Sequence, residues 1–241
     1  MSANGDAARD DSSLFDSNAP TYDRVNSIIS LGLDSRWRDW VAHEAVTHPD
    51  AHVLDAFAGT GLVGLRAAVL GARVTLADFS PGMLSVAMRR ARERGLEVAC
   101  VQTDLTTTTV SVPGAPFDAI TMVFGARYLE DPATVIRNLS LLLGDGGRFV
   151  VLDFVEPDGG VLSRLASIYF FRILPRIAGR LAGRRELYSR LVETTHAMHG
   201  QEHLEAIVRD AGLTIVETRL MGFGLVVGIV AIPGSRATPT P

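Results

Sequence analysis

The segment from 51 to 64, AHVLDAFAGTGLVG, constrains the fold most strongly, because it reads as an apolar strand, a glycine-rich turn and the start of a helix. Gly59, Gly61 and Gly64 spell GxGxxG, and Asp78 follows Gly59 by 19 residues at the end of a second apolar run. Such a turn between a strand and a helix is typical of cofactor sites in α/β proteins. The sequence therefore predicts a cofactor site at this turn.

The spacing between the strand and the turn distinguishes two kinds of cofactor. In a dinucleotide site the first glycine follows the strand directly, so that the pyrophosphate rests on the helix N-terminus. Here three residues separate Asp55 from Gly59, and the Asp55 carboxylate would repel phosphates. An acid suits the ammonium group of S-adenosylmethionine instead, while Asp78 accepts hydrogen bonds from ribose hydroxyls in either case. We therefore expect S-adenosylmethionine, and an NAD(P) oxidoreductase stays an alternative supported only by GxGxxG.

The composition is that of an ordinary globular protein. The chain has 241 residues with 47% hydrophobic content, enough to bury the core of one domain. Its formal charge of -4 argues against a nucleic-acid partner. Cys100 is the single cysteine, which excludes a disulfide framework and fits a reducing cytoplasm. All 23 basic residues are arginine, so lysine Schiff-base chemistry is excluded.

Polar segments frame the chain at both ends. Residues 1–14 are acidic and lack the apolar stretch of a signal peptide, so we expect a disordered tail. Residues 234–241 are expected to form a flexible tail. One domain is then expected over 15–233.

Strands and helices alternate through most of that domain. After one or two helices within 22–47, which we expect to form a lid over the cofactor site, the apolar periodicity predicts strands at 52–55, 73–77, 97–101, 118–123, 148–153, 213–219 and 224–232, and helices at 62–70, 81–94, 132–143 and 201–211. This alternation predicts a doubly wound, mostly parallel sheet. Glycines mark the expected helix ends: Gly71, Gly95, Gly144, Gly146 and Gly147. The acids Asp55, Asp78 and Asp104 follow successive strands, so they should meet at the edge where such sheets bind ligands.

Residues 158–200 interrupt this alternation and read as a helical cap inserted before the last strands. Seven arginines are spaced among apolar residues between 164 and 190, so the segment is too charged to span a bilayer. A basic amphipathic helix packs on the core or lies on a membrane surface. We expect a helical cap that packs on the core, and we keep peripheral contact with anionic membranes through 161–190 as the second interpretation.

The sequence motifs in and between these elements together resemble one family. TYDRVNSIISLGLDSRWRDWV, DAFAGTG, VTLADFSPGML, FDAITMVFGARYLED, LLLGDGGRFVVLDFVEP, RILPRIAG and MHG occur in this order between about residues 15 and 232. Together they resemble the ubiquinone/menaquinone C-methyltransferase (UbiE-type) family. The resemblance implies an enzyme with the class I methyltransferase fold, an α/β seven-stranded sheet whose last strand runs antiparallel, and S-adenosyl-L-methionine as its cofactor.

The resemblance also implies roles for individual residues. Thr60 with its flanking glycines holds the methionine part of the cofactor, Asp78 with Phe79 beside it the ribose, and Asp104 with Leu105 the adenine. The strand end from Val123 to Gly125 closes over the cofactor, and Tyr22 covers it from the N-terminal helix.

The chain departs from the family pattern at two polar positions near the acceptor and at one position of the cofactor loop. Leu62 stands where relatives usually have Asp, Tyr128 where they have Asn, and Phe57 where they have a small residue, whereas Arg127 is retained. We therefore expect cofactor binding to be intact, whereas the identity of the acceptor stays open.

Methyl transfer to carbon needs an electron-rich acceptor, which for a quinol means losing or weakening its O–H proton. Arg127 would stabilise the resulting oxyanion or hold a water that takes the proton; the alternative is a structural ion pair with Glu130 or Asp131. Tyr128 would donate a hydrogen bond or pack an apolar acceptor. His199 is the second candidate base, and no metal site is expected from it and its neighbours His196 and His203.

The leading hypothesis is thus C-methylation of an aromatic, quinol-type apolar small molecule. An enzyme of secondary metabolism that methylates another acceptor, or uses the bound sulfonium for a cyclisation, is the first alternative. A non-catalytic membrane-surface or cofactor-sensing module is another, and a homodimer stays open.

Overall fold

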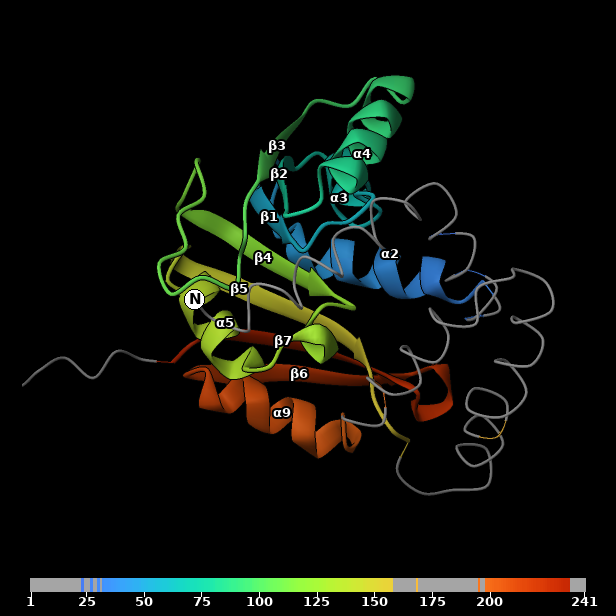
Figure 1. Cartoon of the computed structure of the whole chain (residues 1–241), viewed down its shortest axis with the longest axis vertical. Coiled ribbons are helices and arrows are strands. Elements are labelled where there is room, and N and C mark those ends of the chain that lie inside the picture. The colour runs from blue at the N-terminus through green and yellow to red at the C-terminus, as the bar shows by residue number, and fades with distance from the viewer. Residues whose placement is uncertain are drawn as a thin grey trace, which may run out of the picture.

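The computed structural model describes Asp23, Ser27, Ser30, residues 32–157, Ile168, Thr195 and residues 198–234. The described residues form one seven-stranded sheet in the order β3-β2-β1-β4-β5-β7-β6 (Figure 1). Its strands are β1 (His52–Ala56), β2 (Arg73–Asp78), β3 (Val98–Gln102), β4 (Phe117–Val123), β5 (Leu143–Phe154), β6 (Leu213–Met221) and β7 (Val226–Pro233).

Strands β1 to β5 are parallel, and β7 runs antiparallel to both β5 and β6. The predicted doubly wound sheet with an antiparallel last strand is confirmed. The chain moves outward from β1 through β2 to β3 and then returns to the other side of β1 with β4. The crevice at the carboxyl ends of β1 and β4 is therefore the topological switch point, where open α/β sheets bind ligands.

Two groups of helices cover the sheet, one on each face (Figure 1). They are α2 (Asp34–Ala45), α3 (Gly64–Val69) and α4 (Pro81–Glu93) on one face, and α5 (Pro132–Ser140) and α9 (Gly200–Asp210) on the other. Apolar side chains from both groups pack on the largely apolar strands β1 and β4 and on the apolar second half of β5. A parallel sheet covered on both faces needs such strands, because neither face meets water.

Local signals set the ends of α4. Ser80 accepts a hydrogen bond from the Met83 amide (3.1 Å), Pro81 occupies the first turn, and Gly95 follows the helix with φ +64°. These are the chemistries of an N-cap and a left-handed C-terminal residue. The prediction for Gly71, which follows α3 with φ +94°, is also confirmed.

The prediction that Gly144, Gly146 and Gly147 end a helix at 143 is wrong. Helix α5 ends at Ser140, and these glycines lie in β5, where the pairing with β4 shifts register between Phe117 and Ala119. A close approach explains Gly147, since a Cβ there would lie 3.0 to 3.2 Å from three backbone oxygens.

Several predictions lie outside the described residues: the tail at 1–14, most of the lid before 32, nearly all of the cap at 158–200, and most of the tail at 234–241. In the parts of the chain that the structure describes, no helix has the length and apolar character to cross a bilayer.

Candidate active site

The glycine turn follows β1 and is held in place by Asp55. One Asp55 oxygen accepts a hydrogen bond from the Gly64 amide (2.8 Å), and the other accepts one from the Thr121 hydroxyl of β4 (2.7 Å). The carboxyl is 2% exposed, and burial raises its pKa to about 6 against these hydrogen bonds, which lower it. Asp55 thus connects the start of α3, β1 and β4 at the switch point.

The turn leaves room for a ligand. Gly59 and Gly61 have φ values of +53° and +76°, a conformation that side chains other than glycine rarely adopt. A Cβ added to Gly59 would meet nothing within 4 Å, so a ligand can approach the backbone there. This open backbone fits S-adenosylmethionine, which needs close contact with the turn and no pyrophosphate cradle.

Asp78 ends β2 beside this turn. Its oxygens accept hydrogen bonds from the amides of Gly59 (2.8 Å) and Ser80 (2.9 Å), and the side chain is buried. Asp78 therefore fixes the turn relative to the N-terminus of α4.

Thr60, at the tip of the turn, contacts two residues that the sequence did not suggest. Its hydroxyl donates to both carboxylate oxygens of Asp23, at 2.8 and 2.9 Å, and its carbonyl accepts from Arg90 of α4 (3.4 Å). Arg90 in turn forms an ion pair with Asp23 (2.6 Å). The only sequence signal for Asp23 was its place beside Tyr22, which itself lies outside the described residues.

Three further predicted residues lie near the ends of β2 and β3. Asp104 is exposed and accepts from the amide and the hydroxyl of Thr106, at 2.9 and 2.6 Å, whereas Leu105 is buried in the core. The Phe79 carbonyl accepts from the side-chain amide of Gln102 (3.3 Å). An exposed carboxylate beside a buried leucine is an arrangement that could receive the edge and face of a base.

The ends of β1 and β4 carry an unusual pair of residues. Phe57 and Phe124 directly follow the two strands and have φ values of +57° and +58°. Val123, the last residue of β4, is half-buried and packs against the apolar cluster that contains Phe124. Left-handed backbone at a bulky residue is rare and clusters at functional sites.

Arg127 lies in the short helix η1 (Ala126–Tyr128) and pairs with Asp153 of β5. Its guanidinium contacts Asp153 Oδ1 at 2.5 Å and donates to the Tyr128 hydroxyl at 3.2 Å, and its amide donates to Asp153 Oδ2 at 3.1 Å. Both charged side chains are almost fully buried, while Tyr128 is half-buried.

The suggested ion-pair partners of Arg127, Glu130 and Asp131, are wrong. Asp131 accepts from the Thr134 amide instead and caps α5. The signal for Asp153 was an acid that interrupts the apolar run FVVLDF at a strand end.

Aromatic rings surround this ion pair. The Phe124 ring stacks on Phe154 (centroids 4.8 Å apart) and meets Trp37 edge-on. The guanidinium carbons of Arg38 and Arg127 lie 5.1 and 5.5 Å from the Phe124 centroid. Buried cations next to aromatic faces gain cation–π stabilisation, so this cluster helps to stabilise the buried guanidinium of Arg127.

His199 lies apart from this cluster in its contacts. It is exposed, directly precedes α9, and its Nδ1 is 3.9 Å from Glu156, which follows β5. His203 is its ring neighbour at 5.8 Å, and His196 lies outside the described residues. No group of three metal-ligating side chains occurs among the residues the structure describes.

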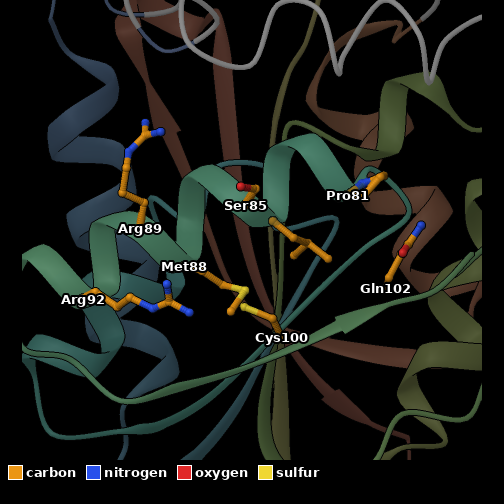
Figure 2. A pocket seen from close by; sticks show the side chains of 8 residues that line it. Pro81, Ser85, Met88, Arg89, Arg92, Cys100 and Gln102 are labelled. Atoms are coloured by element: carbon orange, nitrogen blue, oxygen red, sulfur yellow. The ribbon is translucent and has the colours of Figure 1, made fainter.

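A separate hollow of about 530 Å³ lies between α4 and the edge strand β3. Figure 2 shows Met88 of α4 next to Cys100 of β3, with Ser85, Arg89 and Arg92 also on α4. Neither the glycine turn nor the rim acids line it, so we do not assign it to the cofactor.

Comparison with known proteins agrees with this geometry. The model of the ubiE/COQ5 methyltransferase family matches residues 5–232. The demethylmenaquinone methyltransferase of Thermus thermophilus is 36% identical over 88% of this chain and 96% of its own length. The protein of the same name from Clavibacter sepedonicus is 33% identical over 95% and 94%, and the UbiE C-methyltransferase of Shewanella sediminis 31% identical over 88% and 86%.

Solved structures share the fold. The magnesium protoporphyrin IX methyltransferase of Synechocystis PCC 6803, with bound SAH, matches with a TM-score of 0.59 and 21% identity over 83% of this chain and 84% of that one. The [4+2]-cyclase SpnF matches with a TM-score of 0.61 and 19% identity over 83% and 81%. Since that identity is low, the cyclase shows a shared fold alone and does not favour the cyclisation alternative.

The family match leaves no support for a dinucleotide oxidoreductase, and the predicted cofactor is confirmed at the level of the family. The chain is an S-adenosylmethionine-dependent methyltransferase and belongs to the ubiE/COQ5 methyltransferase family.

Proposed function

We propose that this enzyme methylates a ring carbon of a quinol of the demethylmenaquinol type. The observation that carries the proposal is the polar group of Asp153, Arg127 and Tyr128, which lies at the ligand edge of the sheet and is otherwise surrounded by apolar and aromatic side chains. A flat apolar molecule with one or two oxygens matches such a surface. The names of the relatives at 31–36% identity favour the same class of acceptor.

For the rim residues we propose the cofactor-binding roles that the family resemblance implies. Gly59, Thr60 and Gly61 hold the methionine part, with Asp55 near its ammonium. Asp78 and Phe79 hold the ribose, Asp104 and Leu105 the adenine, and Val123 closes over the cofactor; Tyr22 is expected to cover it. When bound, the cofactor supplies an electrophilic methyl group on a sulfonium.

The chain then has to orient the acceptor and move two protons. Loss of the quinol O–H proton sends charge to the ring carbon, which forms the new C–C bond while the C–S bond breaks. The hydrogen on that carbon leaves as a proton and the ring regains its aromaticity. Positioned groups contribute to such steps mainly by orientation and by hydrogen bonds to the developing oxyanion.

Tyr128 and Arg127 have different roles in these steps. Asp153 neutralises the Arg127 guanidinium, so Arg127 contributes directed N–H groups more than net charge. Arg127 donates to the Tyr128 oxygen, and in this proposal the Tyr128 hydroxyl in turn donates to the acceptor oxygen. Tyr128 is the more exposed of the two side chains and contacts the acceptor first. His199, near the end of β5, is the candidate that receives a proton.

Calorimetry and product analysis test this proposal together. The protein should bind S-adenosylhomocysteine and convert demethylmenaquinol to a product one CH2 unit heavier, with the new methyl on a ring carbon by fragmentation mass spectrometry. A methyl group on oxygen, or no product despite cofactor binding, would contradict the proposed acceptor chemistry. NADH binding tighter than S-adenosylhomocysteine binding would overturn the cofactor roles.

We also propose that residues 161–190, which lie almost entirely outside the described residues, bring the enzyme to anionic membranes where apolar quinols dissolve. Seven arginines between 164 and 190 support this proposal. Flotation with vesicles containing anionic lipid should recover the protein at low salt and less of it at high salt. Absence of flotation at both salt concentrations would reduce the segment to a soluble cap.

A further inference from the structure

Phe57 occupies a backbone conformation that a phenylalanine rarely adopts. Its φ of +57° lies in the left-handed region, which costs free energy for any residue with a Cβ. Phe124, with φ +58°, shares this conformation at the end of the adjacent strand. Residues 57 and 124 therefore flank the switch-point crevice, because β1 and β4 are parallel neighbours with Ala56 opposite Met122.

The two rings differ in what they gain from the fold. Phe124 is 6% exposed, stacks on Phe154 and meets Trp37 edge-on, so burial and ring contacts offset its backbone cost. Phe57 stays half-buried and packs against the core with only part of its surface. The packing of Phe57 alone gives a weaker reason for keeping a strained bulky residue.

The location of Phe57 suggests another reason. A Cβ added to Gly125 would lie 3.4 Å from Phe57 Cβ and 3.5 Å from Phe57 Cγ, so the side chain lies against the residue that precedes Arg127 and Tyr128 by two and three positions. On the other side, Phe57 precedes Gly59 of the cofactor turn by two positions. Phe57 thus lies next to the cofactor turn in the chain and packs against the segment that carries the polar group assigned to the acceptor.

We propose that Phe57 is a specificity-determining residue whose ring forms one wall of the acceptor site and selects a flat, two-ring aromatic acceptor by stacking. The inference rests on the proposed function and names a determinant within it. A ring contact of the usual strength changes affinity by about 2- to 12-fold, so a larger π surface on the acceptor should be preferred.

Replacing Phe57 by glycine separates this role from a structural one. Phe57→Gly removes the ring and its packing on the core but also relieves the left-handed backbone, so the two effects offset one another and the melting temperature should change little. S-adenosylhomocysteine affinity should change less than about twofold. The ratio of kcat/KM for a prenylated naphthoquinol to that for a prenylated benzoquinol should fall by about 3- to 10-fold, as expected for a lost ring contact.

Two further variants complete the experiment. Asp50, at the opposite end of β1, also has a positive φ (62°), so Asp50→Gly is a matched control that relieves backbone strain and should leave the kcat/KM ratio unchanged. Phe57→Leu keeps an apolar side chain and the strain but removes the aromatic face, and should lower the ratio without a gain in melting temperature.

Other outcomes would overturn the proposal. An unchanged kcat/KM ratio in Phe57→Gly would exclude selection by the ring, and a joint fall of melting temperature and cofactor affinity would make Phe57 a packing residue of the turn. A parent enzyme that binds S-adenosylhomocysteine but methylates neither quinol would contradict the proposed function instead. Calorimetric titration of the oxidised naphthoquinone would then still decide the matter, because equal affinity of parent and Phe57→Gly would refute the role of the ring.

Discussion

The Thr60 hydroxyl lies 2.8 Å from one carboxylate oxygen of Asp23 and 2.9 Å from the other, across 37 residues of sequence. Arg90 of α4 contacts the same carboxylate at 2.6 Å. Asp23 therefore ties the N-terminal part of the chain to the tip of the glycine turn and to α4 at once. The contact places residue 23, the neighbour of Tyr22, at the expected edge of the cofactor site.

Asp23→Ala should weaken cofactor binding. Loss of the two charge-assisted contacts removes the link between Asp23 and the tip of the turn, at a cost of about 1 kcal/mol, or roughly fivefold in S-adenosylhomocysteine affinity by calorimetry. Glu93→Ala is the control, because it breaks the exposed Arg89–Glu93 pair on the same helix and should leave affinity unchanged. Equal affinity of parent and Asp23→Ala would show that Asp23 does not help to hold the cofactor.

The raised pKa of Asp55 predicts that cofactor affinity depends on pH. Burial raises this pKa to about 6, so the carboxyl of the free protein takes up its proton as the pH falls through about 6. If the ionised form pairs with the ligand's ammonium, S-adenosylhomocysteine should bind about tenfold more weakly at pH 5 than at pH 7, since one pKa unit corresponds to a factor of ten. Asp55→Asn should bind weakly at both values.

The pH dependence of folding stability that arises from Asp55 is not expected to mimic this pH dependence of cofactor affinity. A raised folded-state pKa means that the folded protein binds the proton more tightly than the unfolded chain, so the Asp55 contribution to stability is present at pH 4 and lost as the pH rises through about 6. The predicted cofactor affinity, in contrast, falls as the pH falls. An affinity that is flat from pH 5 to pH 7 would show that the Asp55 charge does not contribute to binding.

The two left-handed glycines of the turn should differ in their tolerance of alanine. Gly61→Ala adds strain at φ +76° and places a Cβ 2.9 Å from the Cβ of Ala87, which cannot rotate away. Gly59→Ala adds strain at φ +53° but meets no atom within 4 Å. We expect Gly59→Ala to cost about 1 kcal/mol of unfolding free energy and Gly61→Ala about 2 to 4, from strain plus overpacking. Urea denaturation measures both, and equal losses would contradict the steric argument.

Most of the fold could be predicted from local patterns. The apolar strands, the glycines after α3 and α4, and the acids at strand ends identified a doubly wound sheet, because each signal acts within a few residues. The GDGG sequence was the exception. Glycine occurs both at helix ends and in irregular strands. The register shift between β4 and β5 at Phe117 depends on the partner strand, which the sequence pattern does not reveal.

Residues of the candidate site could be selected from the sequence where the signal was local. Local signals selected three residues, because each lies at the end of a strand or in a recognisable sequence motif: Asp55, Asp78 and Arg127. Asp153 and Asp23 were missed because their partners lie 26 and 37 residues away, and a pairing across strands or between segments requires the topology. The substituted residue Phe57 was noticed, but its left-handed backbone follows only from the structure.

The Arg127–Tyr128 contact predicts a coupled loss of turnover. Arg127→Lys keeps the charge beside Asp153 but loses the planar fork that donates to Tyr128, so kcat on the quinol should fall by roughly 10- to 100-fold. Tyr128→Phe should lower kcat by a similar factor with little effect on S-adenosylhomocysteine affinity. If Arg127 acts through Tyr128, the double variant should be about as slow as the slower single variant.

Stability measurements separate this coupling from a merely structural ion pair. Breaking a buried pair such as Arg127–Asp153 by Asp153→Asn should cost about 3 kcal/mol or more of unfolding free energy, because it leaves the guanidinium in an apolar environment without its counter-ion. Tyr128→Phe leaves that pair intact and should change stability little. A purely structural Arg127 predicts that Arg127→Lys lowers the melting temperature while the folded fraction turns over normally. If the losses of kcat multiply in the double variant, Arg127 does not act through Tyr128. The search for the group that handles the acceptor's proton would then shift to His199.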